Sequence, residues 1–153
     1  MNLDEKAAIV APLGFEPMRL GQLLNSDDGR EYSSITGLIA IPAYKVGWEN
    51  RSIKSNLRHF KKTHQCSLSL CSSLNPYALY QKIDELWDAY EKIILAPLGT
   101  KPSTIAISLF LINNFKKNTR KKNISAVYDF PVKSIDRSLG IGKIHLYSMY
   151  STI

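Results

Sequence analysis

Residues 92–102 read KIILAPLGTKP, and residues 7–17 read AAIVAPLGFEP. The tetrapeptide APLG therefore occurs twice, at residues 11–14 and 96–99, each time after an apolar run and shortly before a proline. Glycine permits tight backbone turns, and proline is favoured in the first turn of a helix. We interpret the repeat as one type of strand-to-helix corner that the chain uses twice.

Strand and helix patterns alternate on both sides of these corners. Four strands that alternate with helices predict a mainly parallel sheet, and nearly continuous apolar strands predict that helices cover both of its faces. The last two strands have no helix between them, so we expect them to form an antiparallel hairpin at the sheet edge. The predicted fold is a single Rossmann-like α/β domain over residues 1–153 with about six strands. The predicted strands are residues 7–11, 35–41, 66–71, 93–96, 125–130 and 143–149, and the predicted helices begin at Pro17, Trp48, Pro76 and Pro102.

Two of the predicted helices have distinctive surfaces. In the helix that begins at Trp48, Ile53, Leu57 and Phe60 share one face, and basic residues form a second stripe. The segment 102–114 is apolar nearly all round and rich in isoleucine, which also suits a strand, but the preceding loop and proline favour a helix. A helix of this kind must be buried on several sides. We therefore expect it to contribute to a homodimer interface.

Composition excludes several classes of protein. No apolar run reaches the roughly 18 residues of a membrane span, and the acidic start lacks the basic region of a secretory signal. Cys66 and Cys71 would lie on opposite faces of a strand, where they could neither bridge nor share a metal. The three histidines show no metal-ligand spacing. We expect a cytoplasmic protein with no membrane partner, no metal and no cofactor.

Basic residues are unevenly distributed along the chain. The net charge is +7, and half of the 20 lysines and arginines lie in two short blocks. Such blocks favour an anionic partner, although either block alone is better interpreted as a solvated surface. The blocks contain Arg51, Lys54, Arg58, Lys61 and Lys62, and Lys116, Lys117, Arg120, Lys121 and Lys122.

Both corners are expected where an open parallel sheet binds its ligands, beyond the carboxyl ends of the strands. There the helix that follows presents unpaired N–H groups and a partial positive charge, which favour phosphate. The second corner adds Thr100 and Lys101 to Gly99, whereas the first follows Gly14 with acidic and basic residues. If the two strands are neighbours, the corners form one cleft. Alternatively, APLG is only a good packing turn, an interpretation that is equally strong for the first corner and weaker for the second. The spacing of a Walker phosphate loop is absent.

The residues Gly99-Thr100-Lys101-Pro102 after the fourth predicted strand resemble the Gly-Thr-Lys loop of CRISPR-associated Rossmann-fold (CARF) sensor domains. Those domains carry a second ligand loop after their first strand, where this chain has residues 13–17. The resemblance implies a homodimer whose paired loops hold a cyclic or linear oligoadenylate. It also implies a sensor or accessory component of a prokaryotic anti-phage defence system, either without an effector or acting through a separate partner protein.

Further candidate residues lie close to the predicted cleft. Tyr44 and Trp48 are suited to stacking on a base and Arg51 to binding a phosphate, although they also suit an aromatic pair at the core edge with a surface arginine. Carboxylates at Glu16, Glu49 or Asp129 would instead permit a glycosidase or deoxyribosyltransferase-like enzyme that acts on nucleotides. A third alternative is a general nucleic-acid-binding protein that uses the basic blocks and binds in a salt-sensitive manner.

Overall fold

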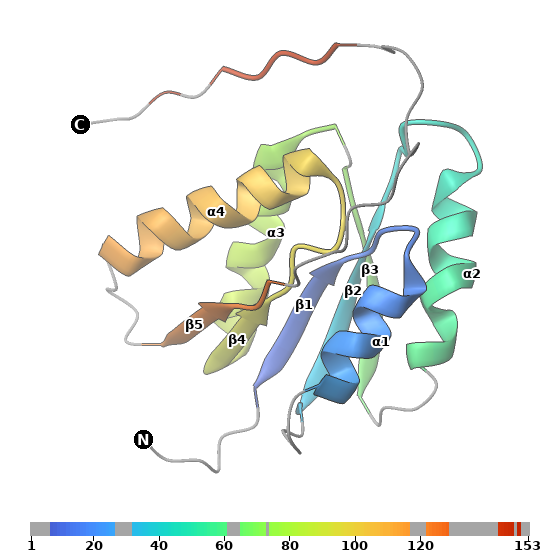
Figure 1. The fold of residues 1–153 in the computed structure, drawn as a ribbon. Coiled ribbons are helices and arrows are strands. Elements are labelled where there is room, and N and C mark those ends of the chain that lie inside the picture. Colours follow the sequence, from blue (N-terminus) through green and yellow to red (C-terminus); the bar gives the residue numbers. More distant parts are fainter. Residues whose placement is uncertain are drawn as a thin grey trace.

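The structure is a computed structural model that describes residues 7–26, 32–60, 65–72, 74–116, 122–128, 144–148 and 150. Five parallel strands form one sheet in the order β3-β2-β1-β4-β5, with helices on both faces (Figure 1). The strands are β1 (Ala8–Pro12), β2 (Ser34–Ala40), β3 (Cys66–Cys71), β4 (Lys92–Leu95) and β5 (Asn123–Ala126), and the helices are α1 (Pro17–Ser26), α2 (Trp48–Phe60), α3 (Pro76–Ala89) and α4 (Lys101–Lys116).

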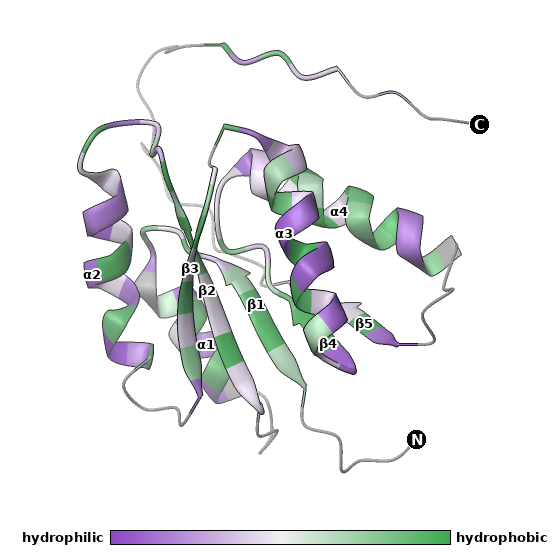
Figure 2. Cartoon of the chain, turned by 180° about the vertical axis from the view of Figure 1, so that it is seen from behind, coloured by the Kyte–Doolittle hydropathy of each residue, from purple (hydrophilic) through white to green (hydrophobic). Residues whose placement is uncertain are grey.

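The core lies in two layers on either side of β1. Because strand side chains alternate, Ile9 packs towards α1 and α2, whereas Val10 packs towards α3 and α4. Every residue of β1 is buried, as its central place in the sheet requires. In Figure 2, green segments dominate β1 and β2, whereas α2 and α3 alternate between purple and green, as expected of helices with one buried face.

The predicted parallel α/β fold is confirmed. The strand at residues 66–71 has the predicted bounds, and three helices begin at the predicted residues. Asn75 caps α3, because its side-chain oxygen accepts hydrogen bonds from the N–H groups of Tyr77 and Ala78. The isoleucine-rich segment is indeed a helix, α4, which begins one residue before Pro102.

The predicted antiparallel hairpin of the last two strands is wrong, because the described part of its second strand, residues 144–148, forms no strand. β5 pairs with β4 in parallel, with Lys92 opposite Asn123 and Leu95 opposite Ala126. The helix α4 connects the two strands as a crossover, and a crossover returns the chain to the end of the sheet at which a parallel strand begins. Residues 144–148, the described part of the predicted sixth strand, belong to no strand. They run along the outside of the domain, and residues 129–130 of the predicted fifth strand lie outside the described residues (Figure 1).

Candidate functional site

The two corners lie in direct contact beyond the carboxyl ends of β1 and β4. β1 and β4 are neighbouring parallel strands, with Val10 opposite Leu95, so the chain leaves both strands in the same direction. A Cβ atom added to Gly14 would collide with the carbonyl oxygen of Leu98, and one added to Gly99 would lie 2.8 Å from the Cβ atom of Pro12. Each glycine therefore makes room for the backbone of the other corner.

Two buried polar side chains of α2 donate hydrogen bonds to the carbonyl groups of the first corner. The Ser52 hydroxyl lies 3.1 Å from the carbonyl oxygen of Leu13 and 3.2 Å from that of Gly14, as a donor to both. The side-chain amide of Asn56 donates to the same Gly14 oxygen at 2.9 Å and to the Ser52 carbonyl at 2.8 Å. Ser52 and Asn56 are only 3% and 2% exposed, so these bonds satisfy groups that water cannot reach.

These bonds also correct the predicted orientation of α2. The helix buries Ser52, Asn56 and Phe60, whereas Leu57, predicted on the buried face, is 41% exposed. Phe60 and Ile53 do pack against the core as predicted, but the buried face of α2 also includes Ser52 and Asn56, which supply hydrogen-bond donors to the carbonyl groups of the first corner. The spacing of Ser52, Asn56 and Phe60, four residues apart, was the available signal in the sequence.

The second corner leads into α4 with several open N–H groups. Thr100 caps the helix, since its hydroxyl accepts from the Ser103 N–H at 3.4 Å and its carbonyl accepts from the Ser103 hydroxyl at 2.6 Å. Among the described residues, no group accepts a hydrogen bond from the backbone N–H of Gly99, Thr100 or Lys101. These amides are available to an anion, and they stand at the positive end of a 16-residue helix.

A cavity of about 300 Å³ opens between the two corners and the first turn of α2. It brings together four of the predicted ligand-binding residues, namely Gly14, Gly99, Thr100 and Trp48. Arg51 and Lys101 do not line it. The Arg51 guanidinium lies 5.3 Å from the centre of the Phe15 ring, a cation–π contact on the surface, and Lys101 is exposed at the start of α4.

Three aromatic rings form part of the cavity wall. Phe15 and Trp48 meet edge to face, with ring centres 5.0 Å apart and planes at 81°, and Tyr44 follows β2. Burial raises the pKa of Tyr44 to about 12, and the neighbouring Tyr147 hydroxyl adds to the rise. The phenol is therefore a neutral hydrogen-bonding group at physiological pH. The His145 ring packs against Tyr44 with 5.5 Å between ring centres, which places residues 144–148 beside this wall.

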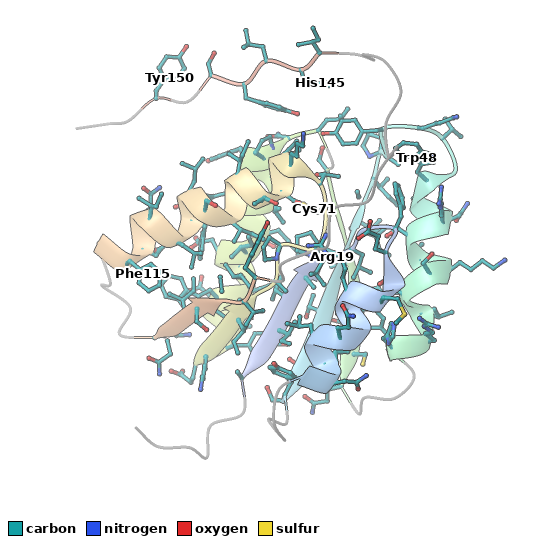
Figure 3. The ribbon with its side chains drawn as sticks, in the orientation of Figure 1. Arg19, Trp48, Cys71, Phe115, His145 and Tyr150 are labelled. Atoms are coloured by element: carbon teal, nitrogen blue, oxygen red, sulfur yellow. The ribbon has the colours of Figure 1, made fainter. Side chains whose placement is uncertain are left out.

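Charged groups of both signs also line the cavity. Arg19 of α1 donates to the carbonyl oxygen of Leu98 at 3.5 Å and so ties α1 to the second corner (Figure 3). Two of the predicted carboxylates, Glu16 and Glu49, share the cavity with it. The third, Asp129, lies outside the described residues. Phe15 belonged to the predicted ligand loop, but its contact with Trp48 depends on the tertiary fold.

The two basic blocks differ in their surroundings. On α2, Arg51, Lys54 and Arg58 form the predicted exposed basic stripe. In the second block, the Lys122 ammonium group donates to the carbonyl oxygens of Trp87 and Asp88, at 3.3 and 2.8 Å. Lys122 therefore satisfies carbonyl groups at the C-terminal end of α3 and stabilises the fold. The other block residues Lys61, Lys62, Lys117, Arg120 and Lys121 lie outside the described part of the chain.

The described residues contain no group of three or more side chains placed to hold a metal ion. Within the same residues, no helix is long and apolar enough to cross a membrane. Cys66 and Cys71 are free thiols, and burial raises the pKa of the Cys71 thiol. Comparison with models of known protein families and with curated proteins finds no match for this chain.

Proposed function

We propose that this protein binds a phosphate-bearing nucleotide or oligonucleotide in the cavity between its two corners. The observation that carries the proposal is the contact between the two glycine corners at the point where the strand order reverses, between β1 and β4. Ligands of open α/β sheets bind at this switch point. Here it opens onto a cavity with aromatic rings on one side and, on another, amides that have no acceptor in the described part of the chain.

The phosphate group belongs at the second corner. The N–H groups of Gly99, Thr100 and Lys101 have no acceptor among the described residues and lie at the N-terminus of α4, and this combination favours an anion. The Lys101 side chain adds a full positive charge at the same place. Although it does not line the cavity, it is exposed at the start of α4 and can reach a phosphate bound at this corner.

The base and sugar belong against the aromatic wall. A nucleobase has an apolar face that stacks on rings such as Tyr44 and Trp48. Ligand cavities usually measure roughly 300–1,000 Å³, so a cavity of about 300 Å³ suits a single nucleotide unit. An oligonucleotide would place one of its nucleotides in this cavity and continue outside it.

A homodimer would supply a second cavity for such a ligand. The outer face of α4 leaves Ile105, Ile112 and Phe115 exposed by 39%, 53% and 63%. Several exposed large apolar side chains on one helix favour a protein contact. Together with the CARF-like Gly-Thr-Lys loop, this face supports a cytoplasmic homodimeric sensor or accessory component of prokaryotic antiviral defence, which signals to a separate effector.

Replacing Lys101 tests the proposal. A charge-assisted contact contributes roughly 1.5–3 kcal/mol, so we expect Lys101→Ala to weaken nucleotide binding by at least about tenfold. The melting temperature should hardly change, because the side chain is exposed. Isothermal titration calorimetry with the ribonucleoside 5′-monophosphates and with linear and cyclic tetra-adenylate measures the affinity.

The matched control is Lys54→Ala, which removes the same charge from the exposed face of α2. It should leave nucleotide affinity unchanged. If Lys101→Ala binds normally while Lys54→Ala and Arg58→Ala weaken binding to long single-stranded DNA or RNA, the binding surface is the basic stripe. The corners would then serve only the architecture.

One observation favours a second candidate, a nucleotide-processing enzyme of glycosidase or deoxyribosyltransferase type. Glu16 and Glu49 line the same cavity, and such enzymes use a carboxylate as a nucleophile or general base at the sugar. Release of free base from nucleotides, followed by chromatography, would reveal this activity. Binding without release of base would leave the sensor as the better interpretation.

A further inference from the structure

The outer side of β3 is an open strand edge. β3 is the first strand in the sheet order, and within the described residues it pairs with β2 alone. The carbonyl oxygens of Gln65 and Cys71 accept hydrogen bonds from β2. Because the backbone groups of successive strand residues point to opposite sides, those of Leu68 and Leu70 point away from β2. They present donors and acceptors with which another strand can pair.

The sequence of β3 lacks the features that usually prevent such pairing. Natural edge strands are kept from pairing by charged side chains, by proline or by a short length. β3 has six residues, Cys-Ser-Leu-Ser-Leu-Cys, with no charge and no proline. The strand at the other end of the sheet, β5, has only four residues. The edge at which we expect a further strand is therefore that of β3.

The two faces of β3 differ in their chemistry. Leu68 and Leu70 share one face, and they are 42% and 62% exposed. Ser67 and Ser69 share the other face, where the hydroxyl oxygens of Ser67 and Thr36 lie 3.0 Å apart in a hydrogen bond. A strand that fits this edge must therefore offer apolar side chains on one face and small polar side chains on the other.

We propose that this strand is β3 of a second copy of the chain, paired antiparallel about a two-fold axis at Ser69. An axis perpendicular to the sheet keeps the leucine faces of both copies on one side and the serine faces on the other. Leu68 then lies opposite Leu70 of the second copy, and the backbone groups of the two residues exchange hydrogen bonds. Parallel pairing about an axis along the strands would instead place leucines against serines. The two sheets of five strands become one sheet of ten.

This contact is separate from the proposed contact through α4 and needs no nucleotide. The helix α4 connects β4 to β5, at the end of the sheet opposite β3. Antiparallel pairing directs the carboxyl ends of the two sets of strands, and with them the two cavities, to opposite ends of the joined sheet. The inference therefore stands or falls independently of nucleotide binding.

Sedimentation velocity with lysine variants tests which surface associates. Ile112→Lys places a charge on the exposed face of α4 and should still form dimers at about 100 μM, as expected of a small interface. Adding Leu70→Lys should leave monomers, because an edge lysine prevents strand pairing. Urea denaturation should show that both proteins remain folded, since both side chains are exposed. A monomeric Ile112→Lys protein, or a dimer that survives Leu70→Lys, would overturn the inference.

Cysteine trapping tests the register of the pairing. In a Cys66→Ser, Cys71→Ser background, which removes both native thiols, Ser69→Cys should give a covalent dimer on oxidation. The two Cα atoms across the axis would be about 4.5 Å apart, within the range of a disulfide. Ser67→Cys is the matched control, because its two copies would be offset by four residues, or roughly 13 Å. Covalent dimers from both variants, or from neither, would contradict the proposed pairing.

Salt distinguishes strand pairing from association through the basic residues. Each copy has a net charge of +7, so two copies repel each other and the β3 dimer should become more stable as added salt screens this repulsion. Copies bridged by a nucleic acid would separate instead, because salt weakens phosphate contacts. We therefore expect a larger dimer fraction of the Ile112→Lys protein at about 0.5 M than at about 0.1 M sodium chloride. A smaller fraction at the higher concentration would overturn the inference.

Discussion

The two APLG corners share four residues and each leads from a strand to a helix, yet they differ in how their polar groups are satisfied. In the first corner, buried side chains of α2 bond the carbonyl groups of Leu13 and Gly14. In the second, the N–H groups of Gly99 and Thr100 have no acceptor among the described residues. The tetrapeptide supplies the turn, and the neighbouring elements decide whether that turn supports the fold or remains open to a ligand.

The contact between the corners explains why the chain needs the same turn twice. β1 and β4 are adjacent, so the chain leaving each strand must pass through the same narrow space at the carboxyl ends of the strands. Gly14 lies against Leu98 of the second corner, and Gly99 lies against Pro12 of the first. A side chain at either glycine would separate the corners, and the cavity between them would change shape.

The largest expected loss of stability comes from adding a side chain in the space between the two corners. Gly14→Ala directs its new methyl group at a backbone carbonyl that cannot rotate away, and overpacking of this kind costs about 1–3 kcal/mol or more. Gly99→Ala should cost less, because one of its two nearest neighbours is the rotatable Ser103 hydroxyl. Urea denaturation should therefore give a lower free energy of unfolding for Gly14→Ala than for Gly99→Ala.

Gly47→Ala provides the control for these two variants. Its new methyl group meets nothing within 4 Å, but its φ of +88° is unfavourable for alanine. We expect a loss of about 1 kcal/mol from backbone strain alone. If Gly99→Ala proved more destabilising than Gly14→Ala, the second corner would be the more tightly constrained of the two, and the comparison would be reversed.

The next effect concerns the buried support of the first corner. Asn56→Ala leaves the carbonyl oxygen of Gly14 with one donor instead of two, so we expect the free energy of unfolding to fall by about 1–3 kcal/mol. The matched control is Asn50→Ala, at an exposed position of the same helix, which should change stability by less than about 0.5 kcal/mol. Equal effects of the two variants would mean that the first corner does not depend on α2.

Much of the fold could be predicted because it depends on local signals. Apolar runs, prolines at helix starts and Asn75 as a cap identify the order of elements, and that order leads to a parallel sheet. The hairpin prediction failed because the alternation of apolar and polar residues shows only that a segment could lie in a sheet. It does not show whether another strand is available to pair with that segment. Leu146, within such a segment, is 92% exposed.

The candidate site was predictable only in part. Gly14, Gly99, Thr100 and Trp48 meet at one cavity because the order of the strands brings their loops together. Hydropathy placed Phe60 and Ile53 correctly on the core side of α2 but misplaced Leu57, and it gave no sign that Asn56 is buried, since Asn56 is buried to form hydrogen bonds rather than to avoid water. Contacts of this kind depend on how closely α2 approaches the first corner, which a hydropathy pattern does not encode.

The smallest expected effect concerns Tyr44, on a wall of the cavity that belongs to neither corner. Burial raises its pKa from 10.0 to about 12, with a smaller contribution from Tyr147, so between these pH values the folded protein keeps a proton that the unfolded chain releases. Its contribution to stability is therefore fully present below pH 10 and is lost as the pH rises towards 12. Because Tyr44 is 39% exposed, solvent screening should keep this loss below about 1 kcal/mol.

Free energies of unfolding measured at pH 9 and pH 11 should show a larger decrease for the wild-type protein than for Tyr44→Phe. Tyr147→Phe should reduce that decrease only in part, because burial is the main cause. An identical decrease in the wild-type protein and Tyr44→Phe would show that this wall is open to water, and the cavity would then be bounded by the two corners and α2 alone.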